Sequence, residues 1–454
     1  MDWKTQKVLV AGSGKSGIGA TDLLKKVGAE VIIYDGNDKL KEEDVLNKLE
    51  NKEDVKVILG ELEDSVINEI DMMVLSPGIA IDAPFVLRVK EAGVPIWGEI
   101  ELAYVIGKGK LVAITGTNGK TTTTALVGEI MANYYDKVDV VGNIGNPYTT
   151  TAFDSTDDTV TVAEISSFQL ETIHTFKPDV SAVLNITPDH LNRHYTMECY
   201  TDVKMSIAKN QDSNQPIVLN YEDPILREYA GKLTNRIIWF SSKQKVNPGV
   251  YLEGKNIIYA DGKKETFVTT TEDTTLVGIH NVENIMAAIA ISINMDVPVD
   301  IIRETIRKFK AVPHRIEYVE TINDVIYYND SKGTNTDASI KAIEAMSRPT
   351  ILIAGGYDKK VSFDDWAEAF GDKVKCLVLL GQTAEQIADT VKKHGFTNII
   401  FTESLKEAVD ECAKNAKPGD AVLLSPACAS WGMFDNYEQR GDMFKEYVRA
   451  MCEK

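Results

Sequence analysis

The chain reads Ala113-Ile114-Thr115-Gly116-Thr117-Asn118-Gly119-Lys120-Thr121-Thr122 at the point that decides its fold. An apolar stretch, residues 111–114, runs into two glycines, a lysine and a threonine, and a helix-like segment follows. Backbone N–H groups in such a turn point into one small space, where the lysine meets β- and γ-phosphates and the threonine hydroxyl holds Mg²⁺. The spacing departs from the usual P-loop, whose first glycine would fall at Ile114, so an ordinary glycine turn is the alternative. The order of strand, glycines, lysine and helix favours a phosphate-binding loop.

Length and composition are those of a soluble enzyme. The 454 residues suggest about three domains, and an apolar fraction of 44% is enough for several cores. The net charge of −19, from 49 Lys and Arg against 68 Asp and Glu, argues against a nucleic-acid or anionic membrane surface. It leaves room for local basic pockets that bind anionic substrates.

Cysteine usage and the apolar runs indicate where the protein works. The five cysteines are an odd number without CxxC spacing, which favours a reduced cytoplasm over a disulfide framework or a zinc site. No apolar run is long enough to cross a bilayer, and the N-terminus does not resemble a signal peptide. We therefore expect a cytoplasmic protein that acts on small molecules, without nucleic-acid or membrane partners, as a monomer.

Strand and helix patterns alternate along most of the chain, which predicts an α/β fold with parallel sheets covered by helices. Three groups of strands are expected, separated near residues 98 and 311, which gives domains 1–98, 99–311 and 312–454. The expected strands are residues 7–11, 31–34, 56–59, 72–75 and 95–97; then 111–115, 159–165, 180–186, 217–220 and 237–240; then 325–329, 350–354, 376–380, 398–401 and 421–424. A small β-meander is expected in residues 243–275 and a helix over 281–295.

A second glycine-rich turn follows the first expected strand. It reads Gly12-Ser13-Gly14-Lys15-Ser16-Gly17, and Asp35 ends the next strand. This is a dinucleotide-binding fingerprint, with glycines for the turn, a helix N-terminus for a diphosphate and an acid for a ribose or base. Taken alone it fits NAD, FAD, any nucleotide diphosphate, or a fold that kept the turn and lost the ligand. Two phosphate-binding loops in one chain indicate that one nucleotide is a handle on a substrate while the other supplies energy.

Candidate metal ligands lie after the phosphate-binding loop. Glu164 ends an expected strand, where a carboxylate could reach Mg²⁺ beside the phosphates or could simply face solvent. His190 follows another strand; histidine is an uncommon Mg²⁺ ligand, and a loop histidine is more often a surface residue. Lys204 falls within an expected helix, where a lysine would ordinarily be solvated.

The order of the motifs resembles the Mur ligase family over essentially the whole chain. The motifs are Thr115-Gly116-Thr117-Asn118-Gly119-Lys120-Thr121, Glu164-Ile165-Ser166-Ser167-Phe168-Gln169, Asp189-His190, His280-Asn281-Val282-Glu283-Asn284 and Pro313-His314-Arg315-Ile316-Glu317. These are ATP-dependent amide ligases of peptidoglycan precursors, with folylpolyglutamate synthetase as a relative. The resemblance implies a Rossmann-like N-terminal domain, a P-loop ATPase-like central domain and a Rossmann-like C-terminal domain.

Two C-terminal segments resemble the members that add D-glutamate to UDP-N-acetylmuramoyl-L-alanine. They are Asn329-Asp330-Ser331-Lys332-Gly333-Thr334-Asn335, and Leu424-Ser425-Pro426-Ala427-Cys428-Ala429-Ser430 with Glu438-Gln439-Arg440-Gly441. The Asp-Asn-Pro-Arg segment typical of the members that add a diamino acid is absent from the sequence. The implied reaction phosphorylates a carboxylate with ATP, and an amine then displaces phosphate from the acyl phosphate.

The resemblance also implies a set of site residues. Catalytic groups are Lys120, Glu164, His190, Lys204 and Lys332; ATP contacts are Gly116, Thr117, Asn118, Gly119, Lys120, Thr121, Thr122, Asn281, Arg315 and Asp330. Contacts to the UDP-substrate are Lys15, Ser16, Asp35, Gly78, Asn143, Ser166 and Gln169; contacts to D-glutamate are Thr334, Lys359, Ser430, Trp431 and Tyr437. Two Mg²⁺ ions are implied, one on Thr121 and Glu164 and one on His190 and Lys204. The lysine is carbamylated by CO₂ in this family, which gives it a carboxylate-like end that can ligate a metal.

One departure and three rival functions remain. Gly36-Asn37 follows Asp35 where family members can carry a hydroxyl and a basic residue, so contacts to the base there are expected to come from the backbone. An NAD-dependent oxidoreductase would leave the second loop and the third domain unexplained. A non-enzymatic nucleotide switch would consume ATP without needing further substrates. A different Mur ligase or a folate ligase is the nearer rival.

The third domain is expected to swing about residues 309–313 when ligands bind.

Overall fold

A computed structural model describes residues 1–143, 146–274, 276–310, 312–358 and 361–452. The chain divides into two compact units. The first comprises Met1–Asp273 and Glu283–Lys308, and the second comprises Thr274–Val282 and Phe309–Lys454. Each unit is built on parallel sheets, which confirms the predicted α/β class.

The first unit begins with a five-stranded parallel sheet in the order β3-β2-β1-β4-β5. Its strands are β1 Lys7–Ala11, β2 Glu30–Asp35, β3 Lys56–Leu59, β4 Met72–Leu75 and β5 Ile96–Gly98, all close to the predicted positions. Helix α1, Lys15–Val27, follows β1 directly. The chain moves outward from β1 in one direction and returns to start β4 on its other side, so a crevice opens between the ends of β1 and β4.

A nine-stranded sheet completes the first unit, in the order β14-β13-β12-β11-β10-β9-β6-β8-β7. Its strands are β6 Lys110–Thr115, β7 Lys137–Gly142, β8 Thr159–Glu164, β9 Val180–Val183, β10 Pro216–Asn220, β11 Arg236–Ser241, β12 Gly249–Glu253, β13 Asn256–Ala260 and β14 Glu265–Thr270. The predicted meander is confirmed as the antiparallel strands β12–β14, which extend this sheet. Strand β7 was missed by the sequence analysis, because it is an edge strand with few buried residues.

The two sheets of the first unit share one hydrophobic core. Helix α5, Glu99–Ile106, connects them and buries Ile100 and Leu102. The same buried cluster contains Leu23 of α1 and Leu111 of β6. This continuity explains why the predicted boundary near residue 98 does not separate two compact units.

The second unit holds a six-stranded sheet in the order β15-β16-β20-β17-β18-β19. Its strands are β15 Glu317–Ile322, β16 Val325–Asn329, β17 Thr350–Ala354, β18 Val374–Leu379, β19 Ile399–Phe401 and β20 Ala421–Leu424. Only β15 was not predicted, and it is the antiparallel edge strand. A two-residue turn, Asn323-Asp324 with φ of 50° and 60°, joins it to β16, as a type I′ hairpin requires.

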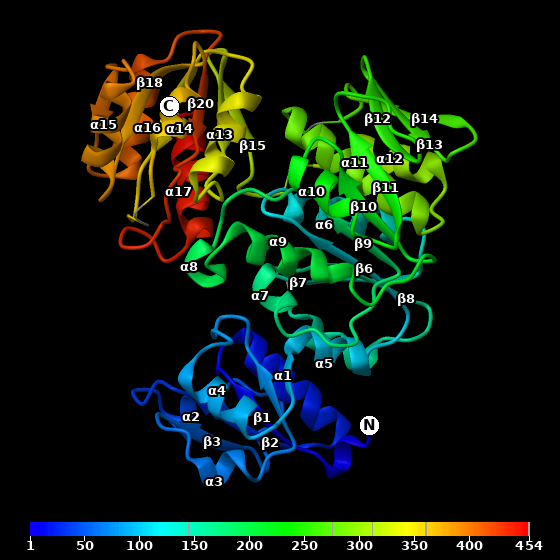
Figure 1. Ribbon diagram of the computed structural model, residues 1–454. Helices are drawn as coiled ribbons and strands as arrows, with labels where there is room; N and C mark the ends of the chain where they lie inside the picture. The colour runs from blue at the N-terminus through cyan, green and yellow to red at the C-terminus, as the bar shows by residue number, and fades with distance from the viewer. Residues whose placement is uncertain (144–145, 275, 311, 359–360, 453–454) are drawn as a thin grey trace. The chain divides into compact units, whose positions relative to one another are not determined.

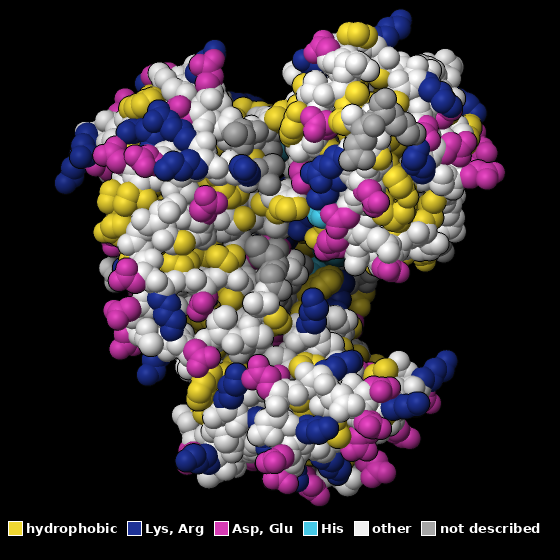
Figure 2. Space-filling model, turned by 180° about the vertical axis from the view of Figure 1, so that it is seen from behind, with side chains coloured by type: hydrophobic (Ala, Val, Ile, Leu, Met, Phe, Trp, Pro, Cys, Tyr) yellow, Lys and Arg dark blue, Asp and Glu magenta, His cyan; other side chains and the backbone are white. Residues whose placement is uncertain are grey.

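Helices cover both faces of the second unit's sheet (Figure 1). One buried cluster joins the sheet to α13, Thr336–Ala345, and α15, Ala384–Lys393; the other joins it to α16, Leu405–Asn415, and α17, Tyr437–Arg449. Lys and Arg side chains alternate with Asp and Glu over the visible surfaces of both units (Figure 2).

Candidate active site

The predicted phosphate-binding loop lies between β6 and helix α6, Lys120–Ala132. Gly116 and Gly119 have φ of 149° and 84°, and a Cβ at Gly119 would lie 2.2 Å from Asn284 Oδ1. The backbone N–H groups of Thr117 and Asn118 donate to the carbonyl and side-chain oxygens of Asn185, at 2.9 and 2.8 Å. Those two amides therefore hold the loop in place, and the positive end of the α6 dipole is left as the anion-binding element.

Two lysines converge on one carbonyl oxygen of this loop. Lys120 Nζ donates to Gly116 O at 2.9 Å and to Thr117 O at 2.8 Å, and Lys204 Nζ donates to the same Gly116 O at 2.9 Å. Lys204 comes from helix α9, Met197–Met205, and is only 2% exposed. Burial, and next the charge of Lys120, lower the pKa of Lys204 well below its usual value. The expectation of a solvated helix lysine, the alternative for this residue, is thus wrong.

Glu164 lies at the end of β8 and has one oxygen available to a cation. Its Oε1 atom accepts a hydrogen bond from Asn143 Nδ2 at 2.8 Å. Its Oε2 atom is buried and has no hydrogen-bond partner among the residues that the structure describes. An unpaired buried carboxylate oxygen is costly, and oxygen is the ligand type that Mg²⁺ prefers. The donor set thus fits a magnesium ion bound beside α6.

His190 adopts a left-handed backbone conformation at the start of helix α8, Leu191–His194, with φ of 53°. Its ring packs edge-on against Phe168, with centroids 4.8 Å apart, and its Nε2 atom lies 3.5 Å from Asp189 Oδ2. No cluster of three His, Cys, Asp or Glu side chains suited to a metal occurs in the described parts of the chain. Any metal here would accordingly rely on hydroxyl, phosphate or modified-lysine oxygens as well.

These side chains line one cavity of about 340 Å³, which we call the central cavity. Its lining is Pro77, Gly78, Lys120, Asn143, Ser166, Ser167, Phe168, Asp189, His190, Tyr200 and Lys204. Six predicted site residues thus line one cavity, while Thr121, Glu164 and Gln169 are not among its lining residues. Tyr200 was not predicted; its hydroxyl lies 3.2 Å from Thr117 Oγ1 and its ring centroid lies 4.8 Å from Lys204 Nζ. Its position four residues before Lys204 on one helix face was the available signal.

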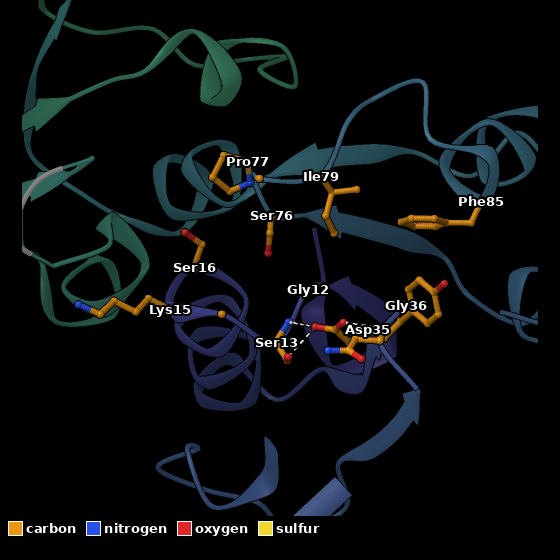
Figure 3. Close-up of a pocket in the computed structure, with 14 residues that line it drawn as sticks. Gly12, Ser13, Lys15, Ser16, Asp35, Gly36, Ser76, Pro77, Ile79 and Phe85 are labelled. Carbon is orange, nitrogen blue, oxygen red and sulfur yellow. Dashed lines mark hydrogen bonds between the residues drawn. The ribbon is translucent and has the colours of Figure 1, made fainter. Parts of the chain in front are cut away.

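A second pocket, which we call the N-terminal pocket, has a volume of about 650 Å³ at the ends of β1, β2 and β4. Its lining is Gly12, Ser13, Gly14, Lys15, Ser16, Tyr34, Asp35, Gly36, Asn37, Ser76, Pro77, Gly78, Ile79 and Phe85 (Figure 3). Four of the residues that the family resemblance implies as UDP-substrate contacts line this pocket: Lys15, Ser16, Asp35 and Gly78. The pocket thus lies at the crevice between the ends of β1 and β4, which is where open α/β sheets bind their ligands.

Asp35 organises the turn of the N-terminal pocket. Its Oδ2 atom accepts from the N–H and hydroxyl groups of Ser13, at 3.0 and 2.6 Å, and its Oδ1 atom accepts from the N–H of Asn37 at 3.0 Å. Burial raises the pKa of Asp35, but these hydrogen bonds outweigh it and hold the pKa below its usual value. Ser76 Oγ, buried in the same pocket, has no partner among the described residues and suits a phosphate oxygen.

The second unit holds the remaining predicted residues. Asp330 is buried, its Oδ2 atom accepts from Ser425 Oγ at 2.7 Å, and burial raises its pKa to about 7. Lys332 Nζ lies 5.4 Å from the ring centroid of Tyr437. The Arg315 Nε atom is buried without a partner among the described residues. Asn281 Nδ2 donates to Val277 O at 2.8 Å, which uses one of its two amide protons.

The predicted D-glutamate contacts are spread over several loops of this unit. The backbone N–H of Thr334 donates to Lys332 O at 2.8 Å, and Ser430 is buried. Trp431 is exposed and packs edge-on against Tyr357, with ring centroids 5.5 Å apart. Lys359 lies outside the described residues.

The geometry defines a class: an α/β protein with two glycine turns, each between a parallel strand and a helix that begins at a lysine, of the kind that binds phosphate groups. The chain matches three families in order: Mur ligase MurD-like, N-terminal domain, over residues 6–98; Mur ligase middle domain over 114–292; and Mur ligase, glutamate ligase domain, over 314–428. The chain therefore belongs to the Mur ligase family, as its motifs predicted, and is a ligase.

Relatives and solved structures agree with this assignment. The protein named UDP-N-acetylmuramoylalanine--D-glutamate ligase from Lachnospira eligens is 58% identical over 99% of this chain and 100% of that protein. The protein of the same name from Clostridioides difficile is 47% identical over the same shares. The MurF ligase of Thermotoga maritima in complex with ADP has a TM-score of 0.62 at 18% identity, over 99% of this chain and 100% of that one. MurC from the same organism gives 0.61 at 19%, with the same coverage. These structures show the fold.

Among the helices in the described parts of the chain, none has the length and apolar character needed to span a membrane.

Proposed function

We propose that this chain joins D-glutamate to UDP-N-acetylmuramoyl-L-alanine at the expense of ATP, in the cytoplasmic stage of peptidoglycan synthesis. One observation carries the proposal: Pro77 and Gly78 line both the N-terminal pocket and the central cavity. A long substrate whose nucleotide end occupies the first site can therefore extend its other end past this turn into the second. The names of the full-length relatives supply the identity of the two substrates.

The reaction forms an amide in two steps. An oxygen of the substrate carboxylate attacks the γ-phosphorus of ATP, the bond from that phosphorus to the bridging oxygen breaks, and ADP leaves. The amine of D-glutamate then attacks the acyl carbon, the C–O bond to phosphate breaks, and the nitrogen loses a proton. Catalysis of this kind depends on positioning and on neutralising the negative charge of the phosphates. Lys120, held by Gly116 O and Thr117 O, lies where it can supply that charge.

Two Mg²⁺ ions fit the residues around the central cavity. Thr121 and Glu164 would hold one, and the unpaired Oε2 atom of Glu164 supports this choice. His190 and a modified Lys204 would hold the other. When bound, the metals neutralise phosphate charge and draw the carboxylate and the γ-phosphate together.

The environment of Lys204 supports the proposed carbamylation. A neutral amine attacks the carbon of CO₂, and loss of one N–H proton leaves a carbamate. Burial beside Lys120 favours the neutral amine, because it lowers the pKa of Lys204. The modification also places an anion close to the Lys120 ammonium, since both side chains contact Gly116 O. The low exposure and the shared contact with Gly116 O support this assignment.

The remaining residues take the roles implied by the family. Lys15, Ser16, Asp35 and Gly78 would bind the uridine diphosphate end; Asn143, Ser166 and Gln169 the muramoyl portion; Gly116 to Thr122, Asn281, Arg315 and Asp330 the ATP; and Thr334, Lys359, Ser430, Trp431 and Tyr437 the D-glutamate, with Lys332 near the transferring phosphate. We further propose domains at 1–98, 99–311 and 312–454, a monomeric state, and closure of the third domain about residues 309–313 during turnover.

The direct test measures phosphate release by the purified chain with ATP, Mg²⁺, UDP-N-acetylmuramoyl-L-alanine and a panel of amino acids. Release is expected only with all substrates present, and with D-glutamate preferred over L-glutamate, L-lysine and diaminopimelate. Preference for a diamino acid or for a folate would assign the chain to a different ligase. ATP hydrolysis without either co-substrate would favour a nucleotide switch.

A further inference from the structure

Glu99 is a buried carboxylate that the proposed reaction does not use. It is the first residue of α5 and only 2% exposed. Its Oε1 atom accepts a hydrogen bond from Gln169 Nε2 at 2.8 Å. Its Oε2 atom has no partner among the described residues, and burial raises its pKa to about 7. A leucine at this position would avoid the cost of burying a carboxyl group. The contact of Glu99 with Gln169 is therefore the feature that a carboxyl group adds here.

Gln169 passes the contact on to Ser166. Gln169 Oε1 accepts from the Ser166 N–H and from the Ser166 hydroxyl, both at 2.9 Å. In return, the Gln169 backbone N–H donates to Ser166 Oγ at 3.3 Å, which completes a capping box at helix α7, Ser167–Leu170. Glu99 Oε1 is the acceptor in this contact, whether as a carboxylate oxygen or as the carbonyl oxygen of a neutral carboxyl group, so Glu99 keeps the NH₂ end of the amide on its own side and the oxygen end towards Ser166.

This arrangement decides what Ser166 offers to a bound molecule. A serine hydroxyl has one proton and two lone pairs. The proton is given to Gln169 Oε1, and one lone pair accepts the Gln169 N–H. The second lone pair is what remains for a ligand, and Ser166 lines the central cavity. Ser166 therefore presents an acceptor to the cavity.

We infer that Glu99 is a positioning residue, which orients the Gln169 amide and thereby makes Ser166 a hydrogen-bond acceptor for an N–H or O–H group of the UDP-substrate. The inference rests on the proposed function for the identity of that substrate. Glu99 does not line the cavity, and it acts through Gln169 and Ser166 alone.

Glu101 provides a matched control two residues along α5. It is also fully buried, but its carboxylate accepts from the backbone N–H groups of His174, Thr175 and Phe176, at 2.6–3.0 Å. Those groups belong to a loop that does not line the central cavity. Loss of Glu101 should therefore affect stability without acting through Ser166.

The test combines substitutions in a double-mutant cycle and measures KM and kcat of phosphate release. Glu99→Leu and Ser166→Ala are each expected to raise the KM for UDP-N-acetylmuramoyl-L-alanine about tenfold, with the KM for ATP unchanged, as for loss of one hydrogen bond. The double variant should again show about tenfold, because both changes remove one interaction. Glu99→Gln should restore KM to within about threefold, since its amide oxygen can still accept. The change in KM caused by Glu101→Leu should add in full to the change caused by Ser166→Ala, because the two residues do not act through one interaction.

A second readout does not depend on activity. In protein labelled with ¹⁵N-glutamine, the Gln169 side-chain amide is identified by the signal lost in Gln169→Glu. We expect a downfield-shifted, slowly exchanging NH₂ signal in the wild type and in Ser166→Ala, and its loss in Glu99→Leu. If Glu99→Leu does not fold, the Glu99→Leu/Gln169→Leu variant removes the contact without leaving an unpaired buried group.

The outcomes separate this inference from the proposed function. Additive effects of Glu99→Leu and Ser166→Ala on KM, or an unshifted Gln169 amide in the wild type, would overturn the positioning role. A wild-type chain that requires a different acceptor substrate would overturn the proposed function, whereas the amide signal would still report on Glu99.

Discussion

Two turns of this chain share one backbone plan and differ in their chemistry. In each, a parallel strand ends, a glycine with positive φ follows, and a helix begins at a lysine: Gly12 at 102° with Lys15 in α1, and Gly116 at 149° with Lys120 in α6. A Cβ at Gly12 would lie 2.6 Å from Ser76 Oγ, so a side chain does not fit there. Because both turns have a strand end, a glycine with positive φ and a helix that begins at a lysine, the backbone conformation alone does not distinguish them.

The surrounding side chains make the difference. In the N-terminal pocket Lys15 extends away from Asp35 (Figure 3). Asp35, at the end of the neighbouring strand β2, accepts hydrogen bonds from the N–H and hydroxyl groups of Ser13. In the central cavity Lys120 folds back onto its own loop, and the buried Lys204 of α9 donates to the same carbonyl oxygen, Gly116 O. A glycine turn of this kind is suited to holding a nucleotide, and becomes suited to phosphoryl transfer where other elements bring charge to it.

The largest contrast is expected between the two helix-initiating lysines. Lys120→Ala should lower kcat/KM by at least about 1000-fold, because under the proposed function the ammonium would face the phosphates whose charge changes in the reaction. Lys15→Ala should cost about tenfold or less, mainly through KM for the UDP-substrate. Phosphate release measures both, and thermal unfolding should show that both variants remain folded. Equal losses would mean that the two turns do not differ in role.

The second contrast concerns Lys204, which is buried, whereas Lys48, the second lysine at the N-terminal turn, is exposed and donates to Ser13 O at 3.4 Å. Lys204→Ala should lose about 100-fold or more in kcat, and small carboxylates such as acetate should restore about tenfold of it by replacing the carbamate oxygens. Depletion of CO₂ and bicarbonate should slow the wild type. Lys209→Ala is the control, since Lys209 follows on the same segment and donates to the Ile173 carbonyl. An active Lys204→Ala variant, or rescue of Lys209→Ala by acetate, would count against the modified lysine.

The sequence predicted the parallel strands and both turns, because continuous apolar runs and glycine spacing are local signals. It failed at β7 and β15, which are edge strands with one exposed face. It also could not show that Lys204 is buried, since this depends on a loop 88 residues away in the chain. The Ser166-x-x-Gln169 capping box was visible in the sequence, but the partner of Gln169 across α5 was not.

A smaller effect is expected at Asp35, which sharpens the role of the N-terminal pocket. Asp35→Ala should raise KM for the UDP-substrate about tenfold and leave kcat and the KM for ATP nearly unchanged, because it removes the acceptor that holds Ser13 and Asn37 in the turn. Asp35→Asn keeps an acceptor oxygen and should lose less. A fall in kcat instead would place Asp35 in the transfer step.

The smallest expected effect is a difference between the two sites in how they respond to a fall in pH. His194 is buried behind the central cavity, with Nε2 lying 3.0 Å from Ser167 Oγ. Burial, and next the charges of Arg193 and His190, lower its pKa from 6.5 to about 4. The unfolded chain thus binds more protons than the folded protein between these values. The resulting stability is complete above about pH 6.5 and is lost as the pH falls towards 4.

The measurement is chemical denaturation of the wild type and His194→Gln between pH 4 and 7. The wild type should lose about 1–2 kcal/mol more than the variant as the pH falls through this window. Because the lining of the N-terminal pocket contains no histidine, binding of UDP should persist at pH 5. The central cavity, whose lining includes the Ser167 that His194 contacts, should lose affinity for ATP first. Parallel stability curves for the two proteins would show that His194 does not titrate in this window, and equal loss of UDP and ATP binding would show that acid does not distinguish the two sites.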